Sequence, residues 1–269
     1  MRKAAVIGGG AAGMMTAVLA AGEKTEIHLY EKNEKLGKKL FITGKGRCNV
    51  TNNAGMEELL QNIPRNGKFL YSAFSHFDGR DAMAFFEGLG VPLKTERGNR
   101  VFPVSDRAAD VIDALFFHMK KLNIPVTQAR ASQICLEEGR VSGVETDCGF
   151  FPCRAAVLAT GGYSYPATGS TGDGYKLAQQ AGHTLVEPVP SLVSLVSRDP
   201  DCKKMMGLAL KNVTLTLLED GKAIFDEQGE MLFTHFGISG PLTLSASSHL
   251  GDMKKHKYEA FIDLKPALS

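Results

Sequence analysis

A glycine-rich turn near the N-terminus constrains the fold of this chain more than any other feature. The apolar run Ala4–Ile7 predicts a buried strand, which leads into Gly8-Gly9-Gly10-Ala11-Ala12-Gly13 and then into an alanine-rich stretch typical of a helix. Gly8 allows the tight bend, Gly10 lets the backbone approach a pyrophosphate, and Gly13 lets the helix pack closely on the strand. The pattern predicts a dinucleotide-binding βαβ unit whose helix N-terminus faces the phosphates.

An acidic residue completes this pattern. The apolar stretch 26–30 predicts the second strand, and Glu31 follows it at about the spacing from the turn that a ribose-binding carboxylate requires. A carboxylate there binds a ribose hydroxyl and disfavours a 2′-phosphate. The alternative is a simple tight turn before a helix. Because strand, helix and acidic residue are all in place, the context favours dinucleotide binding.

Composition and charge exclude several classes of protein. Lys+Arg 31 against Asp+Glu 29 leaves a net charge of +2, so no overall field attracts nucleic acid or an anionic membrane. No apolar stretch is long enough to cross a bilayer, and the N-terminus lacks a signal-peptide pattern. The five cysteines show no zinc-binding spacing, so we expect reduced thiols and no metal. A cytoplasmic location follows as the default expectation.

Alternating strand and helix patterns predict an α/β fold with helices on the faces of a parallel sheet. Asp106 is placed to cap an amphipathic helix whose apolar stripe, typical of a core-facing helix, comprises Val111, Ile112, Leu115, Phe116 and Met119. Short strands with turns over 126–153 predict an antiparallel excursion. The buried run 155–159 then suits a central parallel strand.

Beyond Pro188 the pattern becomes strand-rich. The stretches 213–218 and 223–225, joined across Asp220-Gly221, predict a β-hairpin. We therefore predict two domains: a Rossmann-like cofactor-binding domain over residues 1–188, and the start of a β-rich substrate or insert domain over residues 189–269.

Two further glycine-rich loops can contact a ligand. Thr160-Gly161-Gly162 follows the strand 155–159, and ligands of open α/β sheets bind at the carboxyl ends of strands. The polar loop 169–174, which contains Gly172 and Asp173, runs directly into a helix and can offer N–H groups to an anion. The alternatives are an ordinary strand exit and simple helix capping.

A lysine- and glycine-rich loop spans residues 37–53. Gly46 follows Lys45 where a Walker loop needs Ser or Thr, so a nucleoside triphosphatase is disfavoured. The charges alone fit a solvated or RNA-contacting loop. The dense hydrogen-bonding groups of Arg47, Cys48 and Asn49 instead suit a loop that surrounds a polar ring system.

Four motifs together resemble one bacterial flavoprotein family, the aminoacetone-oxidase-like or 3-dehydro-bile-acid Δ4,6-reductase-like NAD(P)/FAD-dependent oxidoreductases. They are the N-terminal glycine turn, the segment 43–52, the segment 159–162 and the segment 233–241. The resemblance implies FAD in an extended pose, with Glu31 on the adenosine ribose, the glycine turn at the pyrophosphate, and the segment 43–52 near the isoalloxazine. It also implies backbone contact from Ala131 near the adenine.

The resulting set of expected cofactor-binding residues draws on every one of these segments. It comprises Gly8, Gly10, Ala11, Ala12, Gly13, Glu31, Lys32, Lys39, Thr43, Gly44, Arg47, Cys48, Asn49, Ala131, Thr160, Gly161, Gly162, Gly172 and Asp173. Members of the family usually continue well beyond the position of Ser269 and return to the cofactor domain with a last glycine-rich segment. The resemblance therefore implies a truncated chain, a fragment or a divided gene product, with an incomplete site at the flavin.

The leading hypothesis is an FAD-dependent oxidoreductase that acts on a small or steroid-like organic substrate, by C=C reduction or by amine oxidation. FAD carries the redox chemistry itself, and NAD(P)H is the candidate transient electron donor. His235, Tyr165 and Arg47 are acid, base or electrostatic groups by residue type, but each has an equally plausible structural role, so no catalytic residue is assigned. The alternatives are an NAD-dependent dehydrogenase and a non-catalytic RNA-associated flavoprotein.

Overall fold

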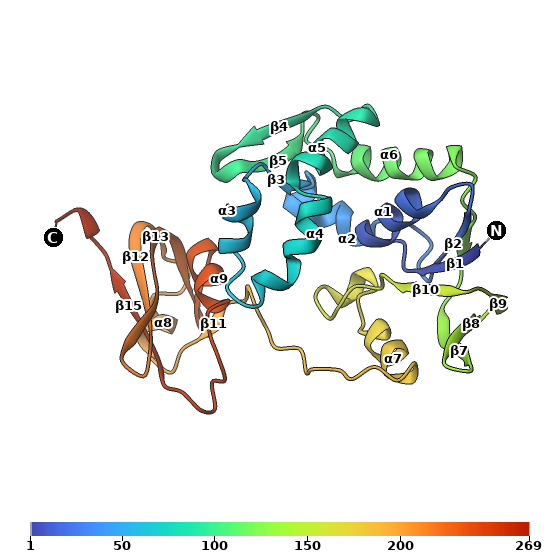
Figure 1. The fold of residues 1–269 in the computed structure, drawn as a ribbon. Helices are drawn as coiled ribbons and strands as arrows, with labels where there is room; N and C mark the ends of the chain where they lie inside the picture. The colour runs from blue at the N-terminus through green and yellow to red at the C-terminus, as the bar shows by residue number, and fades with distance from the viewer. Residues whose placement is uncertain (1, 269) are drawn as a thin grey trace. The chain divides into compact units, whose positions relative to one another are not determined.

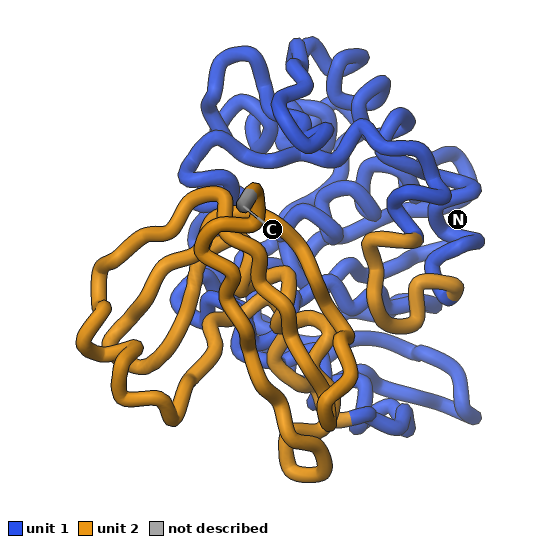
Figure 2. Tube along the Cα trace, turned by 90° about the vertical axis from the view of Figure 1, so that its left-hand side faces the viewer, with its two compact units in different colours: residues 1–60, 69–186 blue, residues 61–68, 187–269 orange. Residues whose placement is uncertain are grey.

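A computed structural model describes residues 2–268 of the chain. The chain divides into two compact units (Figure 2). Unit 1 comprises residues 1–60 and 69–186, and unit 2 comprises residues 61–68 and 187–269.

A parallel four-stranded sheet forms the centre of unit 1 (Figure 1). Its order is β10-β1-β2-β6, and its strands are β1 (Arg2–Ile7), β2 (Thr25–Glu31), β6 (Val126–Gln128) and β10 (Ala155–Leu158). The predicted α/β class and parallel sheet are confirmed. The prediction of a central position for 155–159 is wrong, because β10 is an edge strand with Ala155 exposed. A continuous apolar run predicts that both faces of a strand are buried. Whether the strand lies at the edge of the sheet depends on which distant segments pair with it.

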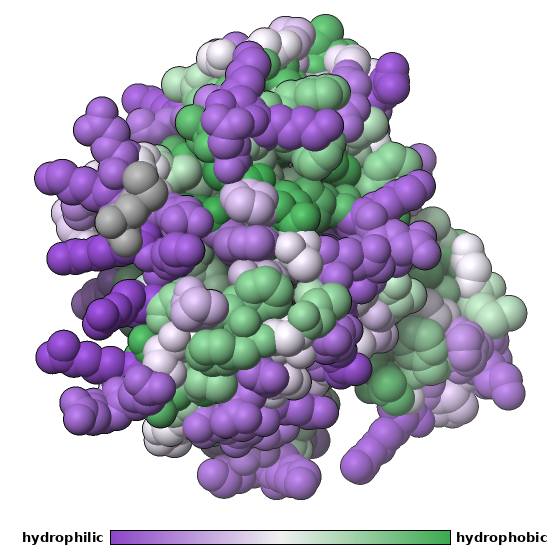
Figure 3. Space-filling model, turned by 90° about the vertical axis from the view of Figure 1, so that its right-hand side faces the viewer, coloured by the Kyte–Doolittle hydropathy of each residue, from purple (hydrophilic) through white to green (hydrophobic). Residues whose placement is uncertain are grey.

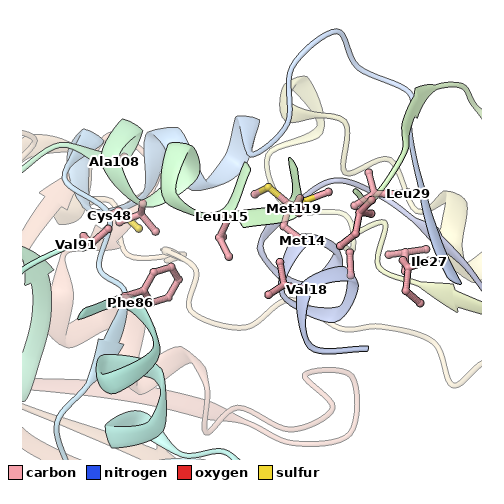
Figure 4. Packing of buried hydrophobic residues seen from close by; sticks show 14 residues of the cluster. Met14, Val18, Ile27, Leu29, Cys48, Phe86, Val91, Ala108, Leu115 and Met119 are labelled. Atoms are coloured by element: carbon pink, nitrogen blue, oxygen red, sulfur yellow. The ribbon is translucent and has the colours of Figure 1, made fainter. Parts of the chain in front are cut away.

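Two helices pack against one face of this sheet, and their apolar side chains form a hydrophobic core with it. The helices α1 (Ala11–Ala20) and α6 (Ala108–Lys121) bring Met14 and Val18 together with Leu115, Met119 and Leu29 (Figure 4). The buried face of α6 confirms the amphipathic prediction. The predicted cap is wrong: the residue before α6 is Arg107, which makes no side-chain cap. The Asp106 carboxylate binds Arg47 and Lys94 instead.

The remaining elements of unit 1 are short. The antiparallel excursion predicted over 126–153 is confirmed for β7 (Ala131–Glu137), β8 (Arg140–Thr146) and β9 (Gly149–Pro152). It is wrong for 126–128, because this stretch is β6, which pairs parallel with β2. A second antiparallel sheet pairs β5 (Arg100–Pro103) with both β3 (Thr51–Asn52) and β4 (Leu93–Glu96). The helices are α2 (Lys38–Ile42), α3 (Met56–Gln61, which reaches unit 2 at its last residue), α4 (Tyr71–His76), α5 (Gly79–Gly88) and α7 (Asp173–Gln180). Short 3-10 turns are η1 (Thr43–Gly46), η3 (Arg97–Asn99) and η4 (Pro166–Thr168), and η2 (Gly67–Leu70) spans the boundary between the units.

Unit 2 is built on a five-stranded antiparallel sheet of order β11-β14-β13-β12-β15. Its elements are β11 (Leu195–Val196), α8 (Asp201–Lys204), β12 (Ala209–Glu219), β13 (Lys222–Thr234), β14 (Gly237–Ser239), α9 (Pro241–Ser247), β15 (Tyr258–Asp263) and η5 (Pro266–Leu268). The predicted hairpin is confirmed, with φ of 49° at Asp220 and 82° at Gly221. Positive φ at both positions matches the twist of the paired strands.

Within residues 2–268, no helix is long and apolar enough to cross a membrane. The face shown in Figure 3 carries mostly hydrophilic side chains, with apolar ones exposed in smaller areas between them. This mixture matches the surface expected of a folded domain.

Candidate functional site

A cavity of about 500 Å³ opens in unit 1 at the carboxyl ends of β1, β2, β6 and β10. Ile7 and Gly8 continue β1, Glu31 ends β2, and Thr160 and Gly161 follow β10. Strand β1 pairs with β2 on one side and with β10 on the other. The chain passes from β1 to β2 through α1, whereas β10 comes much later in the sequence. This is the switch point where open α/β sheets bind ligands.

The glycine turn has the geometry that its spacing predicts. A Cβ added to Gly13 would lie 1.8 Å from the Gly8 carbonyl oxygen, so helix and strand contact each other through bare backbone. Gly8 has a φ of 110°. In contrast, a Cβ at Gly10 would meet nothing within 4 Å, and Gly10 lines the cavity. No side chain caps α1, so the N–H groups of its first turn are available to a ligand.

Glu31 is buried and its carboxylate is held by protein donors. Oε2 accepts a hydrogen bond of 2.6 Å from the Gly9 N–H, and Oε1 accepts bonds of 2.8 Å and 2.6 Å from the backbone and side chain of Asn33. Each carboxylate oxygen can accept more than one hydrogen bond. The carboxylate is therefore oriented and still able to receive a ribose hydroxyl.

Ion pairs link the end of β2 to the start of α7. Lys32 Nζ lies 2.7 Å from Asp173 Oδ2 and donates to Thr171 Oγ1 at 2.8 Å, while Arg130 Nη2 lies 3.4 Å from Asp173 Oδ1. The Lys32 hydrogen bond is the main cause of the lowered pKa of Asp173. Neither Thr171 nor Asp173 caps α7, whose N-cap is Gly172. Lys32 and Asp173 thus bind each other at the cavity wall.

Three more lysines face the cavity without a carboxylate partner in the described part of the chain. Lys38 contacts the amide oxygen of Asn33 at 3.5 Å, Lys39 donates to Ser164 Oγ at 3.2 Å, and Lys35 has no hydrogen bond among residues 2–268. Uncompensated positive charge beside a helix N-terminus suits a diphosphate.

The loop 43–49 divides into two parts. Thr43 lines the cavity with Lys39, whereas Gly44, Arg47, Cys48 and Asn49 do not. The Asn49 amide nitrogen, in the orientation that satisfies its neighbours, donates to the carbonyls of Val101 (3.1 Å) and Thr51 (3.0 Å). Cys48 is fully buried, and burial raises the pKa of its thiol. These residues therefore support the loop from outside the cavity.

Most of the other expected residues lie at the cavity, including Ala11, Ala12 and Ala131. Gly162 and Gly172 do not line it: a Cβ would meet the Tyr175 hydroxyl at 3.0 Å in the first case and the Tyr163 ring at 2.2 Å in the second. The cavity is also lined by Asn33, Lys35, Lys38 and Arg130, which the sequence motifs did not indicate as cofactor-binding, and by Ser170 of the loop 169–174. Asn33, Lys35 and Lys38 closely follow Glu31 in the sequence. This proximity to the predicted ribose-binding residue could have indicated that they line the site.

The candidate acid and base residues do not join this cavity. Tyr165 is 65% exposed on the loop after β10 and has a φ of 54°. His235 belongs to unit 2, where its ring lies edge-on to Phe236 at 5.0 Å. Within residues 2–268, no cluster of His, Cys, Asp and Glu side chains forms a metal site.

An open glycine at a helix N-terminus, a buried carboxylate and lysines without carboxylate partners among residues 2–268 line one cavity, and this combination defines a dinucleotide-binding α/β protein. Residues 2–244 match the family model described as the HI0933-like protein Rossmann domain. The chain belongs to this family, and FAD is the cofactor that the family implies for the cavity.

Two curated relatives cover nearly the whole chain. The 3-dehydro-bile acid delta(4,6)-reductase of Clostridium scindens is 32% identical over 254 residues, which are 93% of this chain and 61% of that protein. The ribosomal RNA dihydrouridine synthase of Escherichia coli is 30% identical over 248 residues, 91% of this chain and 60% of that protein. The chain thus spans about three fifths of the length of these relatives.

A solved structure supports the fold. The 3-ketosteroid-delta4-(5alpha)-dehydrogenase of Rhodococcus jostii RHA1 superposes with a TM-score of 0.50 at 14% identity, over 67% of this chain and 54% of that one. At this identity the likeness shows the architecture alone.

Proposed function

We propose that this chain forms the FAD-binding part of an oxidoreductase that reduces a carbon–carbon double bond conjugated to a carbonyl group. The observation that carries the proposal is the cavity of unit 1, in which Gly10 is open and Glu31 is buried and oriented. The two relatives' names support the reaction. One names a reductase of double bonds in an oxidised bile acid, and the other names the formation of dihydrouridine, a uridine whose ring has lost a conjugated double bond.

Each part of the cavity has a proposed task toward FAD. Glu31 accepts hydrogen bonds from the adenosine ribose, and Ala131 offers backbone beside the adenine. The first turn of α1 and the unpaired lysines hold the diphosphate. Thr43, Thr160 and Gly161 approach the isoalloxazine end. When bound, FAD supplies the hydride chemistry, and the chain binds it, orients it and limits its contact with water.

The remaining assignments extend this proposal. The domain of residues 1–188 holds the cofactor, and the β-rich domain of residues 189–269 contributes to the substrate side. NAD(P)H serves as transient electron donor, and the substrate is a small or steroid-like ketone. We place the protein in the cytoplasm.

A uridine in RNA is the second candidate substrate, and the Escherichia coli relative's name is the observation that favours it. Binding of RNA by lysines would weaken steeply as salt is raised. The small net charge of +2 makes this candidate the weaker one.

Anaerobic half-reactions test the proposal. The chain loaded with FAD is reduced by NADPH or NADH and then mixed with a 3-oxo-4,6-diene steroid, with a uridine-containing RNA, or with the saturated ketone as control. We expect the flavin spectrum to return with a conjugated substrate and to stay bleached with the saturated ketone. Reduction of the oxidised flavin by an amine, with no reoxidation by any conjugated carbonyl compound, would favour amine oxidation and contradict the proposal.

A further inference from the structure

Ser170 is a buried residue whose hydrogen-bond donors have no protein partner. It lies in the loop between β10 and α7, lines the cavity of unit 1 and is only 6% exposed. Among residues 2–268, neither its backbone N–H nor its hydroxyl group has a hydrogen-bond partner. Polar groups of buried residues are nearly always paired, so unpaired donors on a cavity wall indicate a ligand.

The Ser170 hydroxyl opens on the cavity. Every fully buried side-chain nitrogen or oxygen among the described residues has a hydrogen-bond partner, so the unpaired Ser170 oxygen keeps some accessible surface. Because the residue lines the cavity and is so little exposed, that surface faces the cavity. The hydroxyl can therefore bond a group that occupies the cavity.

Gly161 and Lys39 meet Ser170 at one corner of the cavity. Gly161 has a φ of 74°, and a Cβ built on it would lie 2.6 Å from Ser170 Oγ and 3.8 Å from Lys39 Nζ. The Lys39 ammonium donates to the Ser164 hydroxyl at 3.2 Å and has no carboxylate partner within residues 2–268. A hydroxyl group and a positive charge thus converge on the bare backbone of Gly161.

This corner adjoins the glycine turn after β1. A Cβ on Gly8 would lie 3.0 Å from the Cα atom of Thr160, the residue before Gly161. The carboxylates that line the cavity, Glu31 and Asp173, are engaged by other donors. The corner therefore presents an N–H, a hydroxyl and an ammonium group, and this set of donors suits the oxygens of a phosphate.

Two side chains from the segment after β2 hold the loop on both sides of Ser170. Asn33 Nδ2 donates to the Thr168 carbonyl at 3.4 Å, and Lys32 Nζ donates to Thr171 Oγ1 at 2.8 Å. The protein itself therefore fixes the position of Ser170. Donors that are held in place lower the ordering cost of binding.

We propose that Ser170 binds the diphosphate of the cofactor, with its N–H and its hydroxyl group donating to phosphate oxygens and Lys39 supplying the neighbouring positive charge. Two walls of the cavity then hold the diphosphate, namely the first turn of α1 and the loop before α7. The inference deepens the proposed function and rests on it. Hydrogen bonds to a charged group contribute more than those between neutral groups.

Ser170→Ala tests the hydroxyl with two ligands. FAD and ADP share the diphosphate, but ADP lacks the ribityl chain and the flavin ring. We expect calorimetric titration to show both affinities weakened by a similar factor of at least about ten, in line with loss of a hydrogen bond to a charged group. Ser105→Ala, an exposed serine outside the cavity lining, should bind both ligands like the unmodified chain. Weaker FAD binding with unchanged ADP binding would assign the hydroxyl to the ribityl chain or the ring and contradict the proposal.

Urea unfolding of the chain without ligand separates binding from a structural role. The hydroxyl has no protein partner, so Ser170→Ala should leave the free energy of unfolding unchanged. Ser170→Asp should weaken binding of both ligands more than Ser170→Ala does, because its carboxylate repels the diphosphate. A lowered free energy of unfolding in Ser170→Ala, or tighter binding by Ser170→Asp, would contradict the proposal.

Lys39→Met tests the neighbouring charge. Its loss of affinity for FAD and ADP should shrink as salt is raised, since salt screens a charge that is partly exposed, whereas the loss in Ser170→Ala should persist. Lys24→Met, an exposed lysine in the turn before β2, is the matched control and should bind like the unmodified chain. Unchanged affinity in Lys39→Met would remove Lys39 from the proposed site.

The failures of the two proposals differ. FAD uptake by the unmodified chain, with unchanged affinities for FAD and ADP in Ser170→Ala, contradicts only the role of Ser170. Absence of FAD uptake by the unmodified chain contradicts the proposed function.

Discussion

The backbone N–H of Gly9 donates a 2.6 Å hydrogen bond to Oε2 of Glu31. This bond joins the glycine turn after β1 to the carboxylate that ends β2. The turn therefore fixes the orientation of the carboxylate, and the parts of the site that we propose for the pyrophosphate and the ribose form one unit. Such preorganisation lowers the ordering cost of binding.

Two glycine variants separate folding from binding at this turn. We expect Gly10→Ala to weaken FAD binding by at least about tenfold because its Cβ would occupy the space of the pyrophosphate, while the free energy of unfolding changes by under about 1 kcal/mol. Gly13→Ala should lower the free energy of unfolding by roughly 1–3 kcal/mol, because its Cβ would overlap the Gly8 carbonyl. Urea unfolding of the free chain and FAD titration measure both quantities. Equal destabilisation by the two variants would contradict this division.

Glu31→Gln removes the charge from the ribose side. We expect FAD affinity to fall roughly 10- to 100-fold, which corresponds to the 1.5–3 kcal/mol typical of hydrogen bonds to a charged group. Glu26→Gln is the matched control, since Glu26 lies on the same strand and makes only an exposed ion pair of 3.7 Å with Lys3. Calorimetric titration with FAD compares them, and similar affinities for both variants would exclude Glu31 from the site.

The ion pairs of Asp173 with Lys32 and Arg130 predict that the free energy of unfolding depends on pH in the acid range. The pKa of Asp173 is lowered in the folded chain, so its contribution is present above the unfolded pKa of about 3.9 and is lost as pH falls through the folded value. Asp173→Asn leaves Lys32 without its carboxylate and should lower the free energy of unfolding by roughly 1–3 kcal/mol at neutral pH. The loss should shrink toward pH 3. Asp201→Asn, an exposed pair with Lys204, should cost under about 1 kcal/mol.

His28 predicts a second pH effect with a different origin. Burial lowers the pKa of its ring, which stacks on Tyr30 at 4.4 Å and shares a 2.7 Å hydrogen bond with Thr127 Oγ1. The unfolded chain therefore takes up this proton at higher pH than the folded chain, so stability falls as pH drops below about 6.5. His28→Gln should flatten this part of the curve, and His183→Gln, an exposed control, should not. Urea unfolding at several pH values between about 5 and 8 provides the comparison, because histidine titrates within this range, at about 6.5.

Local patterns predicted the architecture of both units because they depend on neighbouring residues. The βαβ turn, the apolar face of α6 and the Asp220-Gly221 hairpin follow from periodicity and turn chemistry, and all three are present. The edge position of β10 could not be predicted this way. Pairing on a strand's edge is decided by which segments lie beside it, and the sequence of β10 does not contain that information.

The same limit explains what was missed at the loop 43–48. Arg47 is 49 residues from Glu96 and 59 residues from Asp106, so its neutralisation is a tertiary effect. Residue type alone indicates Arg47 as an electrostatic group toward the cofactor, whereas Glu96 and Asp106 neutralise its charge. Asp106 illustrates the same point. Its carboxylate binds Arg47 and Lys94 and does not cap α6.

Equilibrium titration of the cofactor-free chain with FAD shows whether the cavity of unit 1 binds this cofactor. Thermal unfolding is followed while FAD or NAD is added, since only a ligand bound by the folded state raises the midpoint. We predict saturable binding of one FAD per chain, a rising midpoint and a flavin spectrum altered by the protein, with NAD giving a much smaller shift. Protection by NAD but not FAD, or by neither, would contradict the assignment.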